Sequence, residues 1–232
     1  MTRKYGLKKF ASRIANRWRT HLGTPVGFGR LMADHRRDRA DGKETMNQAV
    51  IAPLDPSRYL RTPWKNGGGV TIDIAFDGDV WRFSRTPITV AGPFSDYTGF
   101  DRMQVLVAGS GLVLQTPAGD IDVRRPFEPV RFAGETPIVS RLEAGPVEVI
   151  NLMGDRSRVR IDLFVVSANT TRRLGPGLHI AYCPTGRATL KLEGEEHDLQ
   201  ADGGLRIEET NGTVATCSAG RIVMGSVACV SR

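Results

Sequence analysis

At 232 residues the chain is long enough for one domain or two small ones, and for a substantial buried core. Residues 1–45 hold 12 of the 32 Lys and Arg but only 4 of the 25 Asp and Glu, so their net charge is +8 and that of the remaining chain is −1. The body that follows is therefore not expected to carry the basic surface of a nucleic-acid-binding domain.

Residues 1–45 contain no aliphatic run of the length that an export signal or a membrane span needs. Leu7, Phe10, Ile14 and Trp18 recur at helical spacing among basic residues. That pattern is compatible with an amphipathic helix that attaches to a membrane surface or to nucleic acid. We favour a disordered leader, or upstream sequence translated before a true start at Met46, because the first coherent strand pattern begins after Met46.

From Tyr59 onward, short runs rich in Val, Ile, Thr and Phe are separated by Gly, Pro, Asp and Asn at intervals of about 8–12 residues, which is typical of an all-β protein. Asp77-Gly78-Asp79 predicts a hairpin between the first two runs. The strands predicted in this first block are residues 70–76, 80–84, 103–107, 112–116, 121–124, 130–132, 138–142, 147–152 and 159–166.

A second block begins after the polar, turn-prone stretch 167–177. Residues 188–193 alternate apolar and polar side chains, which predicts a half-buried strand. Further strands are predicted at residues 205–207, 213–217 and 221–230. The order of strands and turns in residues 104–123 recurs loosely in residues 180–199. Since an all-β chain must close or cover its sheet edges, we predict two jelly-roll barrels packed together, a first unit of residues 46–166 and a smaller unit of residues 167–232.

Sequence motifs occur in a fixed order between residues 63 and 153. They are Pro63-Trp64-Lys65-Asn66-Gly67-Gly68-Gly69, Trp81-Arg82-Phe83-Ser84, Gly92-Pro93-Phe94-Ser95, Gly99-Phe100-Asp101-Arg102, and Gly145-Pro146 with Asn151-Leu152-Met153. Together they resemble the HutD/Ves family, over roughly residues 50–232. The resemblance implies an all-β bicupin fold of two RmlC-like barrels. It also implies an association with histidine utilisation and a regulatory, ligand-sensing role without an assigned catalytic activity.

The polar residues of the first two motifs are candidate ligand-binding residues. Lys65 and Asn66 lie in a glycine-rich turn that needs neither of them for its backbone geometry. A phosphate loop is not expected, because Lys65 precedes the glycines and a strand rather than a helix follows them. Arg82 and Ser84 share one face of a strand, from which Arg82 can hold a carboxylate through two hydrogen bonds. The alternative for these two residues is a solvated sheet face.

Two later residues complete the candidate set. Arg102 begins a strand, and the alternative to ligand binding is a side chain that extends into water. Asn151 is polar within an otherwise apolar strand, so its amide either faces a ligand or is tied to the backbone. The predicted ligand-binding residues are Lys65, Asn66, Arg82, Ser84, Arg102 and Asn151.

The sequence predicts neither a metal site nor another cofactor. None of the histidines His21, His35, His179 and His197 is spaced as the ligand pair of a metal-binding cupin. The three cysteines show no CxxC spacing, which indicates free thiols and a cytoplasmic location. Cys183 near His179 is a less favoured thiol nucleophile, because a buried structural cysteine is the commoner case.

The leading hypothesis is a non-enzymatic regulatory protein of histidine catabolism that binds a small carboxylate, such as a formylglutamate-like or urocanate-like acid. The alternative is a metal-free cupin enzyme with isomerase-like or deformylase-like chemistry, in which Asp73, Asp101 or Glu148 is the general base. A third hypothesis is a regulator that attaches to nucleic acid or a membrane through the basic leader. The body itself is expected to bind neither, and the fold is compatible with a homodimer.

Overall fold

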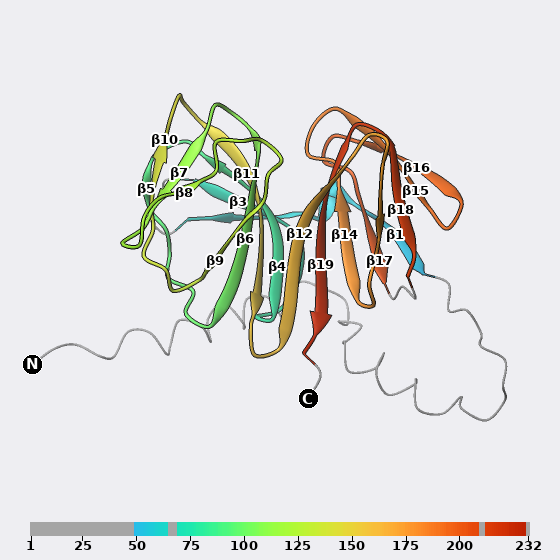
Figure 1. Ribbon diagram of the computed structural model, residues 1–232, viewed down its shortest axis with the longest axis horizontal. Helices are drawn as coiled ribbons and strands as arrows, with labels where there is room; N and C mark the ends of the chain where they lie inside the picture. Colours follow the sequence, from blue (N-terminus) through green and yellow to red (C-terminus); the bar gives the residue numbers. More distant parts are fainter. Residues whose placement is uncertain (1–48, 65–68, 209–211, 231–232) are drawn as a thin grey trace, which may run out of the picture. The chain divides into compact units, whose positions relative to one another are not determined.

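The computed structural model describes residues 49–64, 69–208 and 212–230, all of which belong to one compact unit, Asn47–Arg232. Their regular structure consists of β-strands and one short 3-10 helix, η1 (Pro56–Arg58). The strands form four antiparallel sheets (Figure 1). The prediction of an all-β fold is therefore confirmed. Within the described ranges, no helix is long and apolar enough to cross a membrane.

Two of the sheets contain strands that lie between residues 60 and 155. The six-stranded sheet has the order β2 (Leu60–Pro63), β3 (Val70–Asp77), β4 (Trp81–Ile88), β11 (Val147–Asp155), β6 (Phe100–Ala108) and β9 (Val130–Ala133). The N-terminal four-stranded sheet has the order β5 (Gly92–Pro93), β10 (Val139–Leu142), β7 (Leu112–Gln115) and β8 (Ile121–Asp122).

The other two sheets contain mainly later strands. The five-stranded sheet has the order β1 (Val50–Leu54), β17 (Gly204–Glu208), β14 (Leu178–Tyr182), β19 (Arg221–Cys229) and β12 (Val159–Ser167). The C-terminal four-stranded sheet has the order β13 (Thr170–Arg173), β18 (Val214–Ala219), β15 (Arg187–Leu192) and β16 (Glu195–Gln200). Strands β1 and β12 thus pair with strands of the predicted second unit. The division into units at residue 166 stays a prediction, because strand pairing alone does not define a domain.

Most of the predicted strands and one predicted turn are present. The Asp77-Gly78-Asp79 hairpin joins β3 to β4, with the amide of Val80 donating to the carbonyl of Asp77 at 2.8 Å. Gly78 adopts a φ of +49°, in the left-handed region that glycine occupies without steric cost. The stretch predicted as a turn-prone connection at 167–177 contains strand β13, whose four residues are all exposed. Because all of its side chains are solvated, its sequence lacks the alternation of apolar and polar residues by which a strand is recognised.

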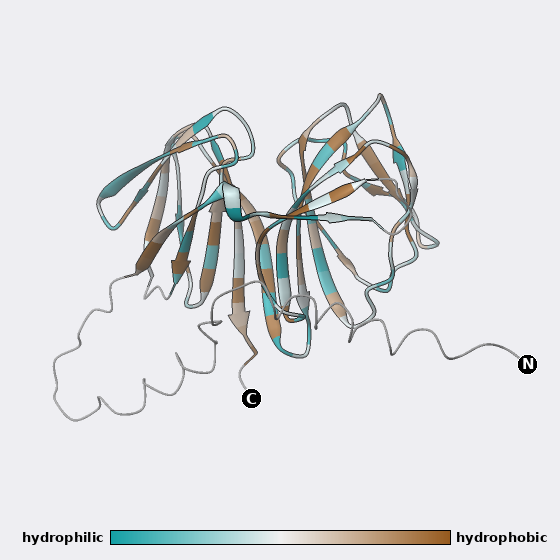
Figure 2. Ribbon diagram, turned by 180° about the vertical axis from the view of Figure 1, so that it is seen from behind, coloured by the Kyte–Doolittle hydropathy of each residue, from teal (hydrophilic) through white to brown (hydrophobic). Residues whose placement is uncertain are grey.

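The core consists of three apolar clusters separated by the sheets. One lies between the six-stranded and five-stranded sheets, one between the five-stranded and C-terminal sheets, and one between the six-stranded and N-terminal sheets. Hydrophilic and hydrophobic bands alternate along many strands, because successive side chains point to opposite faces (Figure 2). The six-stranded sheet is therefore covered on both faces. The polar side chains that it buries define the candidate site.

A polar cluster lies beside the contact of the six-stranded and five-stranded sheets. The guanidinium of Arg85 donates to the carboxylate of Glu148 at 2.5 Å and also to that of Asp202. Two tyrosines extend the cluster, since Tyr182 donates to the Asp202 carboxylate at 2.5 Å and Tyr59 donates to the Asp202 carbonyl at 2.9 Å. These contacts pair every charge with a partner, which indicates a structural role.

Candidate functional site

Four buried polar side chains form a row across the six-stranded sheet. Asp73 on β3 pairs with Ser84 on β4, Ser84 pairs with Asn151 on β11, and Asn151 pairs with Gln104 on β6. Each residue is at most 8% exposed. They lie on the face that the sheet turns toward the N-terminal four-stranded sheet, which we call the inner face. The alternative in which Ser84 lies on a solvated sheet face is therefore excluded, and its role in ligand binding stays a prediction.

Both predicted arginines lie on the same face. Arg82 precedes Ser84 on β4 by two residues, and Arg102 precedes Gln104 on β6 by two residues. Met153 on β11 pairs with Arg82 on one side and Arg102 on the other. The Nε of Arg82 lies 3.3 Å from a carboxylate oxygen of Asp73, and the Arg82 side chain is 24% exposed. The strand register thus brings Arg82, Ser84, Arg102 and Asn151 onto one surface. Lys65 and Asn66 lie outside the described residues.

Arg102 is a buried cation that is surrounded by rings instead of acids. Its guanidinium carbon lies 5.1 Å from the ring centre of Phe94, 5.4 Å from that of Tyr97 and 5.0 Å from that of Phe132. Arg102 is 8% exposed, and no described residue forms an ion pair or hydrogen bond with it. Burial lowers the pKa of the guanidinium to about 10, so it remains charged at neutral pH. The alternative in which the Arg102 side chain extends into water is therefore excluded, and its role in ligand binding stays a prediction.

Several buried polar atoms of the inner face have no hydrogen-bond partner within the described part of the chain. They are Nε of Arg102, both amide atoms of Gln104, and Oδ1 of Asp73. Asp73 is engaged through both oxygens, because Oδ1 lies 3.3 Å from Nε of Arg82 and the second oxygen accepts from Thr62 at 3.0 Å. Burial raises the pKa of its carboxyl, while the charge of Arg82 acts in the opposite sense. Such atoms also occur elsewhere, at Nε1 of Trp81, Nε of Arg85 and Nε2 of His197. Because they are rare in a finished core, those on the inner face make it the candidate site for a polar guest molecule.

A chain of hydrogen bonds links the inner face to the glycine-rich segment. The indole of Trp64 donates to the hydroxyl of Thr71 at 3.0 Å, and that hydroxyl lies 3.4 Å from the hydroxyl of Thr86. Thr86 accepts from the amide of Asn151 at 3.2 Å. Asn151 therefore bonds a side chain, not the backbone. Trp64 is the last residue of this chain of hydrogen bonds. In the sequence it directly precedes Lys65 and Asn66, two of the predicted ligand-binding residues.

One end of the inner face is closed by apolar side chains. Ile88, Leu106 and Val149 continue the strands of the polar residues and pack against side chains of the N-terminal sheet, which include Leu112 and Leu114. These five residues are 0–2% exposed. A low-dielectric wall of this kind strengthens electrostatic attraction on the inner face.

Of the predicted general bases, Asp73 alone lies on the inner face. Asp101 is 37% exposed on its side chain and pairs with Arg131 and Arg156. Glu148 pairs with Arg85 on the opposite face of the sheet. The enzymatic alternative therefore rests on Asp73.

His179 and Cys183, in the second pair of sheets, have internal partners, and the Cys183 thiol donates to the carbonyl of Thr185 at 3.4 Å. Nδ1 of His179 lies 2.7 Å from the hydroxyl of Ser226, and Nε2 lies 2.8 Å from the carbonyl of Gly175. Burial lowers the pKa of His179 and raises that of the buried Cys183 thiol, which disfavours a reactive thiolate. In the described ranges, no three His, Cys, Asp or Glu side chains gather in a way that could hold a metal ion.

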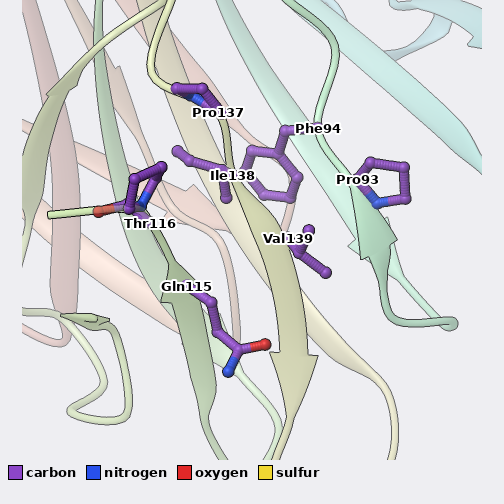
Figure 3. A pocket seen from close by; sticks show the side chains of 8 residues that line it. Pro93, Phe94, Gln115, Thr116, Pro137, Ile138 and Val139 are labelled. Carbon is purple, nitrogen blue, oxygen red and sulfur yellow. The ribbon is translucent and has the colours of Figure 1, made fainter. Parts of the chain in front are cut away.

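A shallow hollow lies on the N-terminal four-stranded sheet and its loops (Figure 3). Its lining includes Pro93, Gln115, Pro117 and Val139, and none of the lining residues is charged. Phe94 belongs to this lining and also contacts the Arg102 guanidinium with its ring. The hollow offers few polar partners, so we assign the candidate site to the inner face instead.

The three aromatic rings around Arg102 and the residue Gln104 were not identified from the sequence. Gln104 is 0% exposed and follows Arg102 by two positions on β6, so both side chains occupy the same face. This spacing within an apolar strand was a usable signal. The three rings gave no such signal in the sequence, because Phe94, Tyr97 and Phe132 come from segments that only the fold brings together.

The sheets and the buried polar face define an all-β protein with a cupin-like fold. The fold resembles that of salicylate 1,2-dioxygenase from Pseudoaminobacter salicylatoxidans, with a TM-score of 0.53 and 9% sequence identity. The comparison covers 100% of this chain and 96% of the other. That likeness shows the fold alone. The family model HutD matches residues 56–224, and the chain belongs to the HutD family. The predicted family is confirmed.

Individual relatives agree with this assignment. An uncharacterized 21.2 kDa protein of the hutC 3′ region in Pseudomonas putida is 30% identical over 172 residues, which cover 65% of this chain and 88% of the relative. Protein Ves of Citrobacter koseri is 27% identical over 114 residues, 47% of this chain and 60% of the relative. The structure of HutD from Pseudomonas fluorescens has a TM-score of 0.68 at 25% identity and covers 78% of this chain and 100% of its own.

Proposed function

We propose that the chain binds a small carboxylate on the inner face, with Arg102 as its main anchor, and that it acts as a non-enzymatic regulatory protein of histidine catabolism. The observation that carries this proposal is a buried guanidinium with no acidic partner among the described residues. A carboxylate is the natural complement, because it matches the fork of donors of an arginine.

The physical argument concerns the cost of the unpaired charge. Burying an ionised group is unfavourable unless it is paired and hydrogen-bonded. Three aromatic rings around Arg102 return part of that cost through cation–π attraction, but they leave its N–H groups without acceptors. A bound carboxylate would supply both the charge and the acceptors. Ser84 and Asn151 on the neighbouring strands would then orient the rest of the ligand.

The site and the family support the choice of ligand class. The relative of known structure from Pseudomonas fluorescens is named HutD. The Pseudomonas putida relative is named for the hutC 3′ region, which links the family to histidine-utilisation genes. We therefore propose a formylglutamate-like or urocanate-like acid as the ligand, with Lys65, Asn66 and Arg82 as further contacts.

The proposal also includes the finer points of architecture and setting. The two pairs of sheets would be two jelly-roll barrels of a bicupin, and we call the six-stranded sheet with the N-terminal sheet the first barrel. The protein would act in the cytoplasm without a metal or other cofactor, either as a monomer or as a homodimer. Its body, with a net charge of −1 beyond residue 45, would bind neither nucleic acid nor membrane.

A metal-free enzyme is the second candidate, and the environment of Asp73 favours it. A buried carboxyl with a raised pKa, which forms an ion pair with Arg82, can exchange a proton with a bound substrate. Incubating N-formylglutamate or urocanate with the protein and following both by NMR separates the two functions. A binding protein returns each acid unchanged, whereas an enzyme converts one of them.

The binding function is tested by a thermal-shift and calorimetric titration with formate, N-formylglutamate and urocanate at constant ionic strength. We expect saturable 1:1 binding and a rise in melting temperature, because a ligand of the folded state alone stabilises it. Formate has three non-hydrogen atoms, so its dissociation constant should be on the order of millimolar. Sulfate and ethylammonium serve as controls for anion shape and charge sign. The proposal fails if none of the three acids shifts the melting temperature at millimolar concentration.

A further inference from the structure

Residues 94–98, which connect β5 to β6, cover Arg102 with two of its three aromatic rings. Phe94 and Tyr97 belong to this segment, whereas Phe132 belongs to β9 of the six-stranded sheet. Both rings of the segment are half-buried. The other residues of the segment are exposed, namely Ser95, Asp96 and Thr98. The burial of the segment therefore depends on the two rings that lie over the guanidinium.

Two amide hydrogen bonds join the segment to the connection between β9 and β10. The amide of Phe94 donates to the carbonyl of Ile138 at 2.9 Å, and the amide of Tyr97 donates to the carbonyl of Gly134 at 2.9 Å. If these two bonds and the ring contacts break, the segment is released while β6 keeps its pairing with β11 and β9. An opening of this size costs less free energy than global unfolding.

Gly99 follows the segment directly and has the properties of a hinge. Its φ is +91°, and a Cβ at this position would meet nothing within 4 Å. The amide of Arg156 donates to the carbonyl of Gly99 at 3.1 Å, which fixes the chain at the point where β6 begins. Because glycine has the widest choice of backbone conformations, rotation at Gly99 moves residues 94–98 without moving β6.

The hollow on the N-terminal four-stranded sheet gives the Phe94 ring a place to turn into. Phe94 lines this hollow and also contacts Arg102, so its ring is a wall that the hollow shares with the buried guanidinium (Figure 3). The volume of the hollow, about 550 Å³, exceeds that of a phenylalanine side chain. Pro93 and Val139 offer the displaced ring an apolar surface. An outward turn of Phe94 would therefore connect the solvent with Arg102.

We propose that residues 94–98 form a lid, which admits a carboxylate from the hollow to Arg102 and closes over it. This inference rests on the proposed carboxylate site and adds the route by which the ligand enters. It explains how a solute reaches a side chain that is only 8% exposed. In the closed state the rings of Phe94 and Tyr97 exclude water from the guanidinium and its bound carboxylate, which strengthens their attraction.

A lid has a kinetic signature that a fixed wall lacks. Because the lid opens before both entry and release, a substitution that favours the open state raises the association and dissociation rate constants by the same factor. The dissociation constant then stays unchanged. Line shapes of 13C-labelled formate in NMR titrations measure both rate constants. For the wild-type protein the association rate constant should lie below about 10⁷ M⁻¹ s⁻¹, against roughly 10⁸–10⁹ M⁻¹ s⁻¹ for an unhindered encounter.

Gly99→Ala is the substitution that favours the open state, since a side chain strains a backbone with a φ of +91°. Both rate constants should rise by about five- to thirtyfold, with the dissociation constant within about twofold of the wild type. Gly78→Ala is the matched control, because Gly78 has a φ of +49° and equally open surroundings but lies in the β3–β4 hairpin. It should leave both rate constants unchanged. Gly134→Ala favours opening independently, because its Cβ would collide with the carbonyl oxygen of Tyr97.

Amide hydrogen exchange of the ligand-free protein tests the opening without a ligand. The amides of Phe94 and Tyr97 should exchange faster than those of β6, and faster still in Gly99→Ala. Exchange no faster than that of β6 overturns the lid, and so do unchanged formate rate constants in both Gly99→Ala and Gly134→Ala. A change in the dissociation rate constant alone also overturns it, because the segment then acts as a contact and not as a gate. If formate does not bind the folded wild-type protein, the carboxylate site is overturned, while hydrogen exchange still decides whether the segment opens.

Discussion

Replacing Arg102 with Met is expected to abolish carboxylate binding while leaving the folded protein at least as stable as the wild type. Met keeps an unbranched apolar side chain among Phe94, Tyr97 and Phe132 and removes the charge. The lowering of the pKa of Arg102 to about 10 by burial corresponds to an unfavourable free energy on the order of 3 kcal/mol. Below pH 10 the guanidinium is charged in both the folded and unfolded states, so the full penalty is present at neutral pH.

The net effect on stability also includes the lost ring contacts, which are worth on the order of 1–2 kcal/mol. We therefore expect the free energy of unfolding of Arg102→Met to exceed that of the wild type by about 0–3 kcal/mol in urea titrations. Calorimetry with formate should show no saturable binding. Arg125→Met is the matched control, because Arg125 is 76% exposed on its side chain and pairs with the exposed Glu128. It should change neither quantity measurably. Unchanged formate affinity in folded Arg102→Met would contradict the assignment.

The largest loss of stability is expected from Phe83→Ala, with a cost of about 3–5 kcal/mol. Phe83 is 0% exposed and packs edge-to-face on Tyr182, with ring centres 6.1 Å apart and an interplanar angle of 73°. It joins the six-stranded sheet to the five-stranded sheet at the centre of their shared core. Thermal unfolding should shift down by roughly 6–20 °C, given about 2–4 °C per kcal/mol for a protein of this size.

A double-mutant cycle with Gly225 makes this prediction specific. A Cβ added at Gly225 would lie 2.7 Å from Cδ2 and 2.9 Å from Cε2 of Phe83. Gly225→Ala alone should therefore cost on the order of 1–3 kcal/mol, and most of that cost should vanish in the Phe83→Ala background. Gly92→Ala is the control, since nothing lies within 4 Å of a Cβ at that position. Strictly additive effects of the two substitutions would show that the ring and the glycine are not in contact.

The fold was largely predictable because its sheets have local signatures. Alternation in residues 188–193 corresponds to β15, and the apolar run 159–166 corresponds to β12. Strand β14 was harder to identify, because all five of its residues are buried and it lacks alternation. The pairing of β1 with β17 was not predictable, since the two strands are about 150 residues apart and no local pattern encodes their contact.

The candidate site was predictable only in part, for a similar reason. Arg82 and Ser84 share a strand, so the alternation of side chains places them together without knowledge of the fold. Their position opposite Asn151 and Arg102 depends on the register of β11 with its two neighbours. A register of this kind is set by packing across the whole sheet, and it carries no mark in the short motifs themselves.

The central claim is that a carboxylate binds on the inner face at Arg102, and a crystal structure with 3-bromopropionate tests it most directly. Bromine gives an anomalous signal that locates the ligand independently of the protein model. The account predicts a bromine peak between the six-stranded and N-terminal sheets, with the carboxylate within hydrogen-bonding distance of the Arg102 guanidinium. A peak in the outer hollow beside Pro117 and Val139, with only water at Arg102, would contradict it.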